Sequence, residues 1–185
     1  MAATLEREVK LHFDDPEAAR AAVLAAGGTP VRGRRLQEDC LLDTVDELLR
    51  RRRSVLRVRM ESGRNFLTFK GPVQTSVMKL REELETVVGD GTLVLRVLEE
   101  LGFRVWFRYQ KYREEFALDD VIIAVDETPV GTYVEIEGGE RGIATTAEAL
   151  GRRPSDYVLD SYRWLYVRDC QARGLPVTNM LFDGD

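Results

Sequence analysis

LEREVKLHF, residues 5–13, alternates apolar and polar side chains over a segment that we expect to form a β-strand. Side chains alternate across a strand, so one face carries Leu5, Val9 and Leu11. The opposite face carries Glu6, Glu8, Lys10 and His12. The apolar face is an ordinary buried face, whereas two glutamates at this spacing repel each other unless another group lies between them. Taken alone, this stretch could have its charged face in solvent. The other strands have to show whether the charged face points to solvent or to an interior.

The composition indicates a globular chain with an unusual share of charge. At 185 residues and 44% hydrophobic content, we expect one domain with a sizeable core. Charged residues reach 32%, above the usual quarter or so. The net charge of -5 argues against a general nucleic-acid binder, which carries a basic surplus.

Several function classes lack the residues that they need. Cys40 and Cys170 are far apart and without metal-ligand spacing, which fits a reduced, cytoplasmic protein. We expect no signal peptide and no membrane association, because a charged strand begins at once and no apolar run is long enough to span a bilayer. His12 is the sole histidine, and neither a P-loop nor a GxGxxG turn occurs.

The pattern along the chain predicts many antiparallel strands with helices between them. The expected strands are 4–13, 34–42, 54–61, 65–72, 78–88, 105–118, 120–128 and 131–138. The expected helices are 15–26, 46–52, 90–102, 145–151 and 155–173. So many antiparallel strands in one domain favour an α+β fold, either an eight-stranded closed β-barrel or a sheet curled nearly shut, with helices packed outside it.

Strand after strand repeats the two faces of residues 5–13, one apolar and one charged. The acidic side chains at these alternating positions are Glu6, Glu8, Glu83, Glu85, Asp126, Glu135 and Glu137. The basic ones are Lys10, Arg57, Arg59, Lys70, Arg81, Lys111 and Arg113. If the apolar faces pack under the helices, the charged faces must line the interior of the barrel. Small barrels usually have the opposite arrangement, with an apolar inside.

A charged lumen is costly unless its charges are paired or bind ions. Paired glutamates bring together hard oxygen ligands, which suit one or two Mg²⁺ or Mn²⁺ ions. Arginine and lysine side chains fixed on strands suit phosphate oxygens. The combination predicts polyphosphate chemistry, in which positioning and charge neutralisation do most of the catalytic work. The alternative is a lumen of stabilising ion pairs without a substrate.

These residues also resemble a known family, the CYTH superfamily or triphosphate tunnel metalloenzymes. The resemblance covers about residues 4–140 and places its motifs in family order. It rests on an ExExK motif at residues 6–10, a paired-basic strand at 56–59, a lysine strand at 69–72, RxExE at 81–85, KxR at 111–113, Asp126, and the pair Glu135 and Glu137. It implies one domain over residues 1–185, with tunnel strands over about 4–140 and C-terminal helices over about 145–174.

The resemblance also implies roles for the charged residues. Lys10, Arg57, Arg59, Lys70, Arg81, Lys111 and Arg113 would bind the triphosphate. Glu6, Glu8, Asp126, Glu135 and Glu137 would bind the metal or support its ligands, and Glu83 and Glu85 would join them or shape the mouth. Lys10 would orient ligands or the attacking water. Lys10, Glu8 and Glu137 are therefore the expected catalytic residues.

Three functions remain open at this point. The first is metal-dependent hydrolysis of a linear triphosphate, which could be inorganic tripolyphosphate or a nucleoside or thiamine triphosphate. The second is a class IV adenylate cyclase that converts ATP to cyclic AMP and pyrophosphate, and the third is a sensor that binds triphosphate without turnover. We favour hydrolysis, because water is always available and a nucleoside pocket is an extra requirement. Dimers are common in the family, so a homodimer is left open.

Some residues receive a plainer interpretation. We expect His12 to be a packed or rim residue, the basic run Arg50–Arg53 to be a solvated turn, and Tyr133 to fill space or contact a substrate ring. The aromatic residues of the last helix are expected to dock on the barrel. They are Tyr162, Trp164 and Tyr166.

Overall fold

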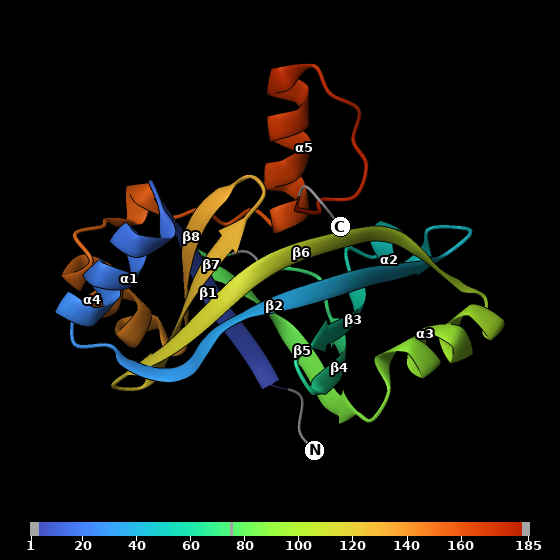
Figure 1. The fold of residues 1–185 in the computed structure, drawn as a ribbon, viewed down its shortest axis with the longest axis horizontal. Coiled ribbons are helices and arrows are strands. Elements are labelled where there is room, and N and C mark those ends of the chain that lie inside the picture. The colour runs from blue at the N-terminus through green and yellow to red at the C-terminus, as the bar shows by residue number, and fades with distance from the viewer. Residues whose placement is uncertain (1–3, 75, 183–185) are drawn as a thin grey trace.

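The structure, a computed structural model, describes residues 4–74 and 76–182. Its strands form one closed barrel in the order β1-β5-β4-β3-β2-β6-β7-β8, and all neighbouring strands are antiparallel (Figure 1). The predicted eight-stranded barrel is therefore confirmed. The strands are β1 Thr4–Phe13, β2 Thr29–Thr44, β3 Val55–Glu61, β4 Arg64–Lys70, β5 Lys79–Val88, β6 Phe103–Leu118, β7 Val121–Thr128 and β8 Gly131–Glu137.

The helices lie outside this barrel. They are α1 Pro16–Ala25, α2 Leu48–Arg51, α3 Gly91–Glu100, α4 Glu140–Ala149, the 3₁₀ turn η1 Pro154–Asp156 and α5 Tyr162–Arg173. Figure 1 shows α1 and α4 together at one end, α3 at the other end, and α5 standing above β6 and β8. Among the described residues, no helix has the length and apolar character that a membrane crossing requires.

Sequence signals at the helix ends explain where the helices begin and stop. Asp15 accepts a hydrogen bond from the Ala18 backbone N–H at 2.7 Å, and Asp90 accepts one from Leu93 at 2.9 Å. These side chains satisfy N–H groups that a helix leaves unpaired in its first turn. Gly174 ends α5 with φ of 66°, a left-handed conformation that favours glycine.

The second strand is longer than its sequence predicts. We expected a short strand over 34–42, but β2 has 16 residues and pairs with β6 along most of that length. Its register with β6 shifts between Pro30 and Arg32 and again between Arg32 and Arg35. Pro30 and Gly33 weaken the strand pattern in the sequence, and pairing with a long partner overrides that local preference.

The C-terminal third also departs from the expected helix bounds. The predicted helix over 145–151 is α4, which begins earlier at Glu140, and the predicted helix over 155–173 is divided. After η1, Val158 pairs with Lys10 of β1 through two backbone hydrogen bonds of 3.2 and 2.8 Å. Ser161 then caps α5 by accepting a hydrogen bond from Trp164. This backbone pairing brings the start of α5 to the barrel.

The main core lies between the outer face of the barrel and the helices. Val9 and Leu11 of β1 pack there with Val23 of α1 and with Ile143 of α4. The apolar faces therefore point outward, as the alternation predicted, and this orientation leaves the charged faces to line the lumen.

Candidate functional site: a charged lumen

The lumen of the barrel holds a cavity of about 390 Å³ with a charged wall. Among the described residues, eight basic and seven acidic side chains line it. Every predicted site residue except Asp126 belongs to this wall. The wall comprises Glu6, Glu8, Lys10, Arg57, Arg59, Lys70, Lys79, Arg81, Glu83, Glu85, Tyr109, Lys111, Arg113, Glu115, Glu135, Glu137, Ser161 and Tyr162.

Strand register determines which charges meet. Glu8 of β1 lies opposite Glu137 of β8 on one side and opposite Lys79 of β5 on the other. Lys10 lies opposite Glu135 in the next inward position. Residues directly opposite in an antiparallel pair have Cβ atoms about 4.5–5.5 Å apart, so these side chains meet within the lumen.

Glu8 and Lys10 form the centre of one ion-pair network. The Lys10 Nζ lies 3.0 Å from a carboxylate oxygen of Glu8 and 3.0 Å from one of Glu135, and Lys79 also pairs with Glu8. Burial by itself would raise the pKa of Glu8, but Lys10 and Lys79 outweigh it and hold the pKa well below its ordinary value. Glu8 is therefore a carboxylate at neutral pH.

Lys79 was not among the predicted site residues. Burial lowers its pKa to about 8, with Glu8 acting in the opposite direction. Lys79 shares the inward face of Arg81 two positions away, so the alternation rule could have found it. The expected strand over 78–88 already contained Lys79, so the sequence held the signal and the residue was overlooked.

Asp126 lies behind the cavity wall and is fully buried. Lys111 Nζ donates to it at 2.8 Å, the Arg113 guanidinium donates to both of its oxygens at 2.6 and 2.5 Å, and Tyr162 Oη donates to it at 2.6 Å. Arg113 also pairs with Glu135. This arrangement suits a carboxylate that orients two of the basic side chains predicted to bind phosphate. Whether Asp126 also binds a metal stays a prediction.

Tyr162 connects the C-terminal helix to the lumen. Besides its hydrogen bond to Asp126, its ring centroid lies 5.2 Å from Lys10 Nζ and 4.9 Å from Lys111 Nζ. Burial lowers the pKa of Lys111 to about 8, and Arg113 adds to this effect. The sequence predicted only that Tyr162 docks on the barrel, so its hydrogen bond to a site residue is a new finding.

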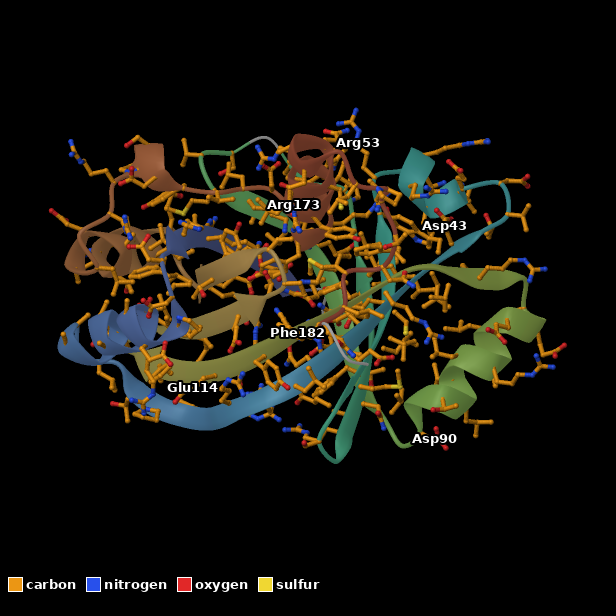
Figure 2. The ribbon with its side chains drawn as sticks, turned by 45° about the horizontal axis from the view of Figure 1, so that its top comes forward. Asp43, Arg53, Asp90, Glu114, Arg173 and Phe182 are labelled. Carbon is orange, nitrogen blue, oxygen red and sulfur yellow. The ribbon has the colours of Figure 1, made fainter. Side chains whose placement is uncertain are left out.

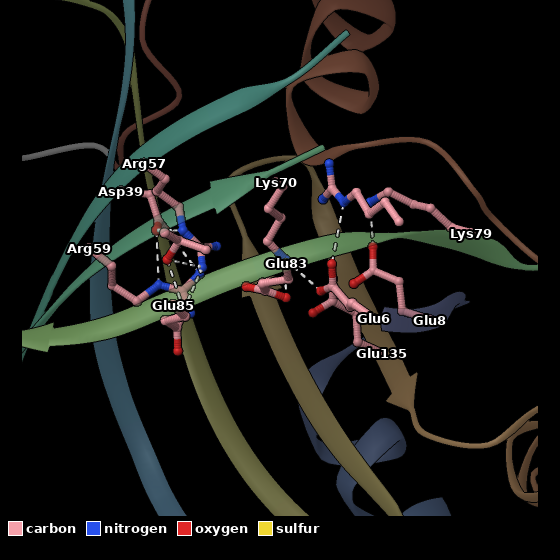
Figure 3. A network of polar contacts seen from close by, with 12 residues as sticks. Glu6, Glu8, Asp39, Arg57, Arg59, Lys70, Lys79, Glu83, Glu85 and Glu135 are labelled. Atoms are coloured by element: carbon pink, nitrogen blue, oxygen red, sulfur yellow. Dashed lines mark hydrogen bonds and ion pairs between the residues drawn. The ribbon is translucent and has the colours of Figure 1, made fainter. Parts of the chain in front are cut away.

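A second network involves Asp39 of β2, which the sequence analysis did not select. Arg59 donates to its two oxygens at 2.9 and 3.2 Å, and the Arg57 Nε lies 3.4 Å from it. Burial opposes the charge of Asp39, but Arg59 and Arg57 lower its pKa below the ordinary value. Figure 3 shows this group at one end and Glu6, Glu8, Lys79 and Glu135 at the other, with Lys70 and Glu83 between them.

Lys70 links the two ends of the lumen. Its Nζ pairs with Glu6 and lies 3.1 Å from Glu83, while Arg81 lies 3.3 Å from Glu6. Glu85 accepts from Arg57 at 3.3 Å and from Thr68 at 2.8 Å. The acids on β5 therefore hold the basic side chains toward the cavity.

The carboxylate oxygens of the lumen are hard ligands of the kind that Mg²⁺ and Mn²⁺ prefer. Within residues 4–74 and 76–182, no three carboxylates converge on one point that could hold a metal, since most are paired with lysine or arginine. Glu137 differs, because no ion pair is formed by it among the described residues. Burial, with Glu6 and Glu8 nearby, raises its pKa to about 7, and a cation beside these acids would relieve their repulsion.

The plainer interpretations have mixed outcomes. His12 is exposed and packs edge-to-face on Tyr133, with ring centroids 5.5 Å apart. Arg50 to Arg53 are exposed on and after α2, and Figure 2 labels Arg53 near this helix. Of the last-helix aromatics, Tyr162 and Tyr166 pack against the barrel, whereas Trp164 does not dock and is 61% exposed.

Comparison with known proteins identifies the class of protein. The CYTH domain matches residues 4–152, so the chain belongs to the CYTH family. A Methanocaldococcus jannaschii protein named "Putative adenylate cyclase MJ0240" is 28% identical over 134 residues, which are 72% of this chain and 76% of that protein.

Solved structures share the fold at low identity. A protein from Vibrio parahaemolyticus, described as a putative adenylate cyclase, has a TM-score of 0.77 and 18% identity over 89% of this chain and 98% of that one. A Hippeastrum protein, HpAC1, is described as a putative adenylyl cyclase with a dominant triphosphatase activity. It has a TM-score of 0.65 and 20% identity over 93% of this chain and 97% of that one.

Proposed function

We propose that this protein is a divalent-metal-dependent phosphohydrolase that acts on a linear triphosphate in the lumen. The observation that carries the proposal is the cavity wall, in which eight basic side chains surround a space of about 390 Å³. Buried ion pairs contribute little to the stability of a fold, so binding of a charged substrate better explains why the lumen holds so many charged side chains. A linear triphosphate is a multiply charged anion whose oxygens match arginine and lysine donors.

The chain's own residues would divide the work. Arg57, Arg59, Lys70 and Arg81 would hold phosphate oxygens from one side of the lumen, and Lys111 and Arg113, oriented by Asp126, would hold them from the other. Lys10 lies 3.0 Å from both Glu8 and Glu135, where it would orient the acids or the attacking water.

Glu6, Glu8 and Glu137 are the residues that would hold Mg²⁺ or Mn²⁺, with Glu83, Glu85 and Glu135 close by. The metal would neutralise phosphate charge and activate water. When Glu6 and Glu8 turn toward a cation, their lysine and arginine partners become available to the phosphate oxygens. Hydrolysis also fits the activity described for the Hippeastrum protein.

Cyclisation of ATP is the second candidate. It is favoured by the name of the Methanocaldococcus jannaschii relative and by a second cavity that adjoins the lumen and offers space for a nucleoside. In this reaction the ribose 3′ hydroxyl attacks the α phosphorus and pyrophosphate leaves. Both reactions use the same phosphate-binding wall.

Product analysis by ³¹P NMR tests the proposal. Purified protein is incubated with Mg²⁺ or Mn²⁺ and with ATP or tripolyphosphate in separate samples. Release of orthophosphate without cyclic AMP is expected, and the Glu8→Gln variant should not release it. Cyclic AMP with pyrophosphate would instead establish the cyclase. Binding of both compounds without any product would leave the sensor or a different substrate, such as thiamine triphosphate.

A further inference from the structure

Asp39 is a fully buried carboxylate that lies behind the wall of the lumen. It is 0% exposed, and it is not one of the described side chains that line the lumen or the second cavity. The strand register places it directly opposite Arg59 of β3 on one side and opposite Tyr109 of β6 on the other. Asp39 can therefore affect a ligand in the lumen only through the side chains that it contacts.

The carboxylate of Asp39 contacts two arginine side chains at once. Arg59 donates to both of its oxygens, from Nε at 2.9 Å and from Nη2 at 3.2 Å, and the Arg57 Nε lies 3.4 Å from Oδ1 (Figure 3). A bidentate pair fixes the plane of a guanidinium as well as its position. Arg59 uses one edge of its guanidinium for Asp39, and because Arg59 lines the lumen, the remaining donors are available to a ligand there.

The orientation of Arg59 depends on Asp39. Within residues 4–74 and 76–182, Asp39 is the only hydrogen-bond partner of the Arg59 guanidinium. Arg57 has further support, since its Nη2 donates to Thr68 at 3.2 Å and to Glu85 at 3.3 Å. Without the charge of Asp39, two guanidinium groups at successive inward positions of β3 would repel each other, and Arg59 would have no fixed acceptor.

A second aspartate has the same relation to the lumen. Asp126 is also 0% exposed and is not among the described residues of either cavity wall, and it holds two basic side chains at successive inward positions of β6. It lies directly opposite Arg113, as Asp39 lies directly opposite Arg59. Glu8 differs from both aspartates because it lines the cavity, where a ligand can reach it.

We propose that Asp39 is a positioning residue that holds Arg57 and Arg59 in the orientation in which they bind one phosphate group of the substrate. This inference rests on the proposed function and deepens it, because it gives a role to a residue that does not contact the triphosphate. Arg59 should stay paired with Asp39 when the ligand binds, so that little side-chain entropy is lost. The competing role is structural, in which Asp39 only neutralises two buried arginines and lets the barrel fold.

Calorimetry with tripolyphosphate on the full chain separates the two roles. Asp39→Asn keeps the size of the side chain, but its amide group presents a donor where Arg59 needs an acceptor. In Ca²⁺, we expect the dissociation constant to rise about 10- to 100-fold while every folded chain still binds ligand. A structural role would instead lower the fraction of protein that binds and leave the dissociation constant unchanged, and that result would overturn the inference.

Glu61→Gln is the matched control. Glu61 is a buried carboxylate on β3 that pairs with Arg32 at 2.5 Å and with Arg35 at 3.1 Å, and among the described side chains neither arginine lines a cavity. This variant should keep the native dissociation constant. A similar rise in Glu61→Gln and Asp39→Asn would attribute the effect to the loss of any buried charge and would contradict a positioning role.

A double variant tests whether Asp39 acts through Arg59. Arg59→Gln alone should weaken tripolyphosphate binding about 10-fold or more, because it removes a charged donor. Adding Asp39→Asn should weaken it by less than about threefold further, since the guanidinium that Asp39 orients is already missing. If the effects of the two substitutions multiply instead, Asp39 does not act through Arg59.

NMR of the native protein tests the same point should Asp39→Asn not fold. The Arg59 Nε–H is bound to a buried carboxylate, so it should exchange slowly with water both without and with saturating tripolyphosphate. Faster exchange in the complex would show that Arg59 leaves Asp39 for the phosphate, which would overturn the inference. Absence of tripolyphosphate binding by the native protein would refute the proposed function itself.

Discussion

The two faces of β1 are about equally buried, but one carries apolar side chains and the other carries charged ones. On the outer face Val9 and Leu11 are 1% and 0% exposed, and on the inner face Glu8 and Lys10 are 6% and 2% exposed. The outer side chains pack against α1 and α4, whereas the inner ones pair with one another and with Glu135.

This difference between the two faces of β1 indicates that one serves stability and the other serves the proposed function. Burying a leucine or valine side chain contributes about 1.5–3 kcal/mol to stability. A buried ion pair contributes little, because desolvation of the charges offsets their attraction. The outer face therefore holds the barrel closed, and the inner face keeps charged groups in place for the triphosphate that we propose.

Truncation on the outer face should give the largest effect on stability. Leu11→Ala removes buried methyl groups from the main core and should lower the free energy of unfolding by about 2–5 kcal/mol. Urea denaturation measures this loss. The folded fraction of the variant should keep its affinity for triphosphate, and a selective loss of affinity at full folding would contradict the division between the two faces.

A neutral substitution on the inner face should affect turnover most. Glu8→Gln keeps the shape of the side chain but removes a proposed metal ligand, so we expect turnover to fall by about 100-fold or more. Steady-state phosphate release measures it.

Glu61→Gln provides the matched control for this prediction. Glu61 is also a buried carboxylate with basic partners, since Arg32 lies 2.5 Å and Arg35 3.1 Å from its oxygens, but it does not line the lumen cavity. The Glu61→Gln variant should be less stable than the native protein but should keep the native turnover. Similar losses of turnover in both variants would assign Glu8 a structural role.

Removing the Tyr162 hydroxyl should have a moderate effect. Tyr162→Phe deletes only the hydrogen bond to Asp126, and a hydrogen bond to a charged group contributes about 1.5–3 kcal/mol. We expect triphosphate affinity to fall about 10-fold through the misoriented Lys111 and Arg113. Tyr166→Phe is the control on the same helix, because Tyr166 bonds to Thr178 and Asn179 outside the cavity. Equal effects of the two variants would argue against a positioning role for Tyr162.

The smallest effect should come from the titration of Glu137. Its pKa is raised to about 7 from 4.5, so the folded protein keeps a proton that the unfolded chain releases between these values. Without divalent ions, stability should therefore fall as pH rises from 4.5 to 7, by less than about 1 kcal/mol because solvent reaches this side chain at the rim.

Glu137→Gln should remove this slope from the denaturation curves. Glu148→Gln, on the exposed surface of α4, should not. An unchanged slope in Glu137→Gln would show that other groups cause the pH dependence.

Strand alternation was enough to predict the barrel and most of its charged wall, because it depends only on neighbouring residues. It also applies to Lys79, which lies within the expected strand over 78–88 and on the same face as Arg81 but was not selected. The length of β2 depends on pairing with β6 across Pro30, and the start of α5 depends on Val158 pairing with β1. Such non-local pairings leave no local sequence pattern.

The second cavity, which adjoins the lumen, could not be predicted for the same reason. Trp106 and Trp164 lie on different elements, and only the folded chain places them around one space. Alternation on β6 gives no sign that Trp106 faces the segment before α5.

Binding of tripolyphosphate tests most directly whether the inner face of the barrel is a triphosphate site. Calorimetry in Ca²⁺ should show one tripolyphosphate per chain, with affinity reduced about 10- to 100-fold in Lys70→Ala, which loses a charged donor within the lumen. Arg20→Ala on α1, which breaks an exposed ion pair with Glu114 of β6, should bind like the native protein. Absence of binding, or equal affinities of Lys70→Ala and the native protein, would contradict the account.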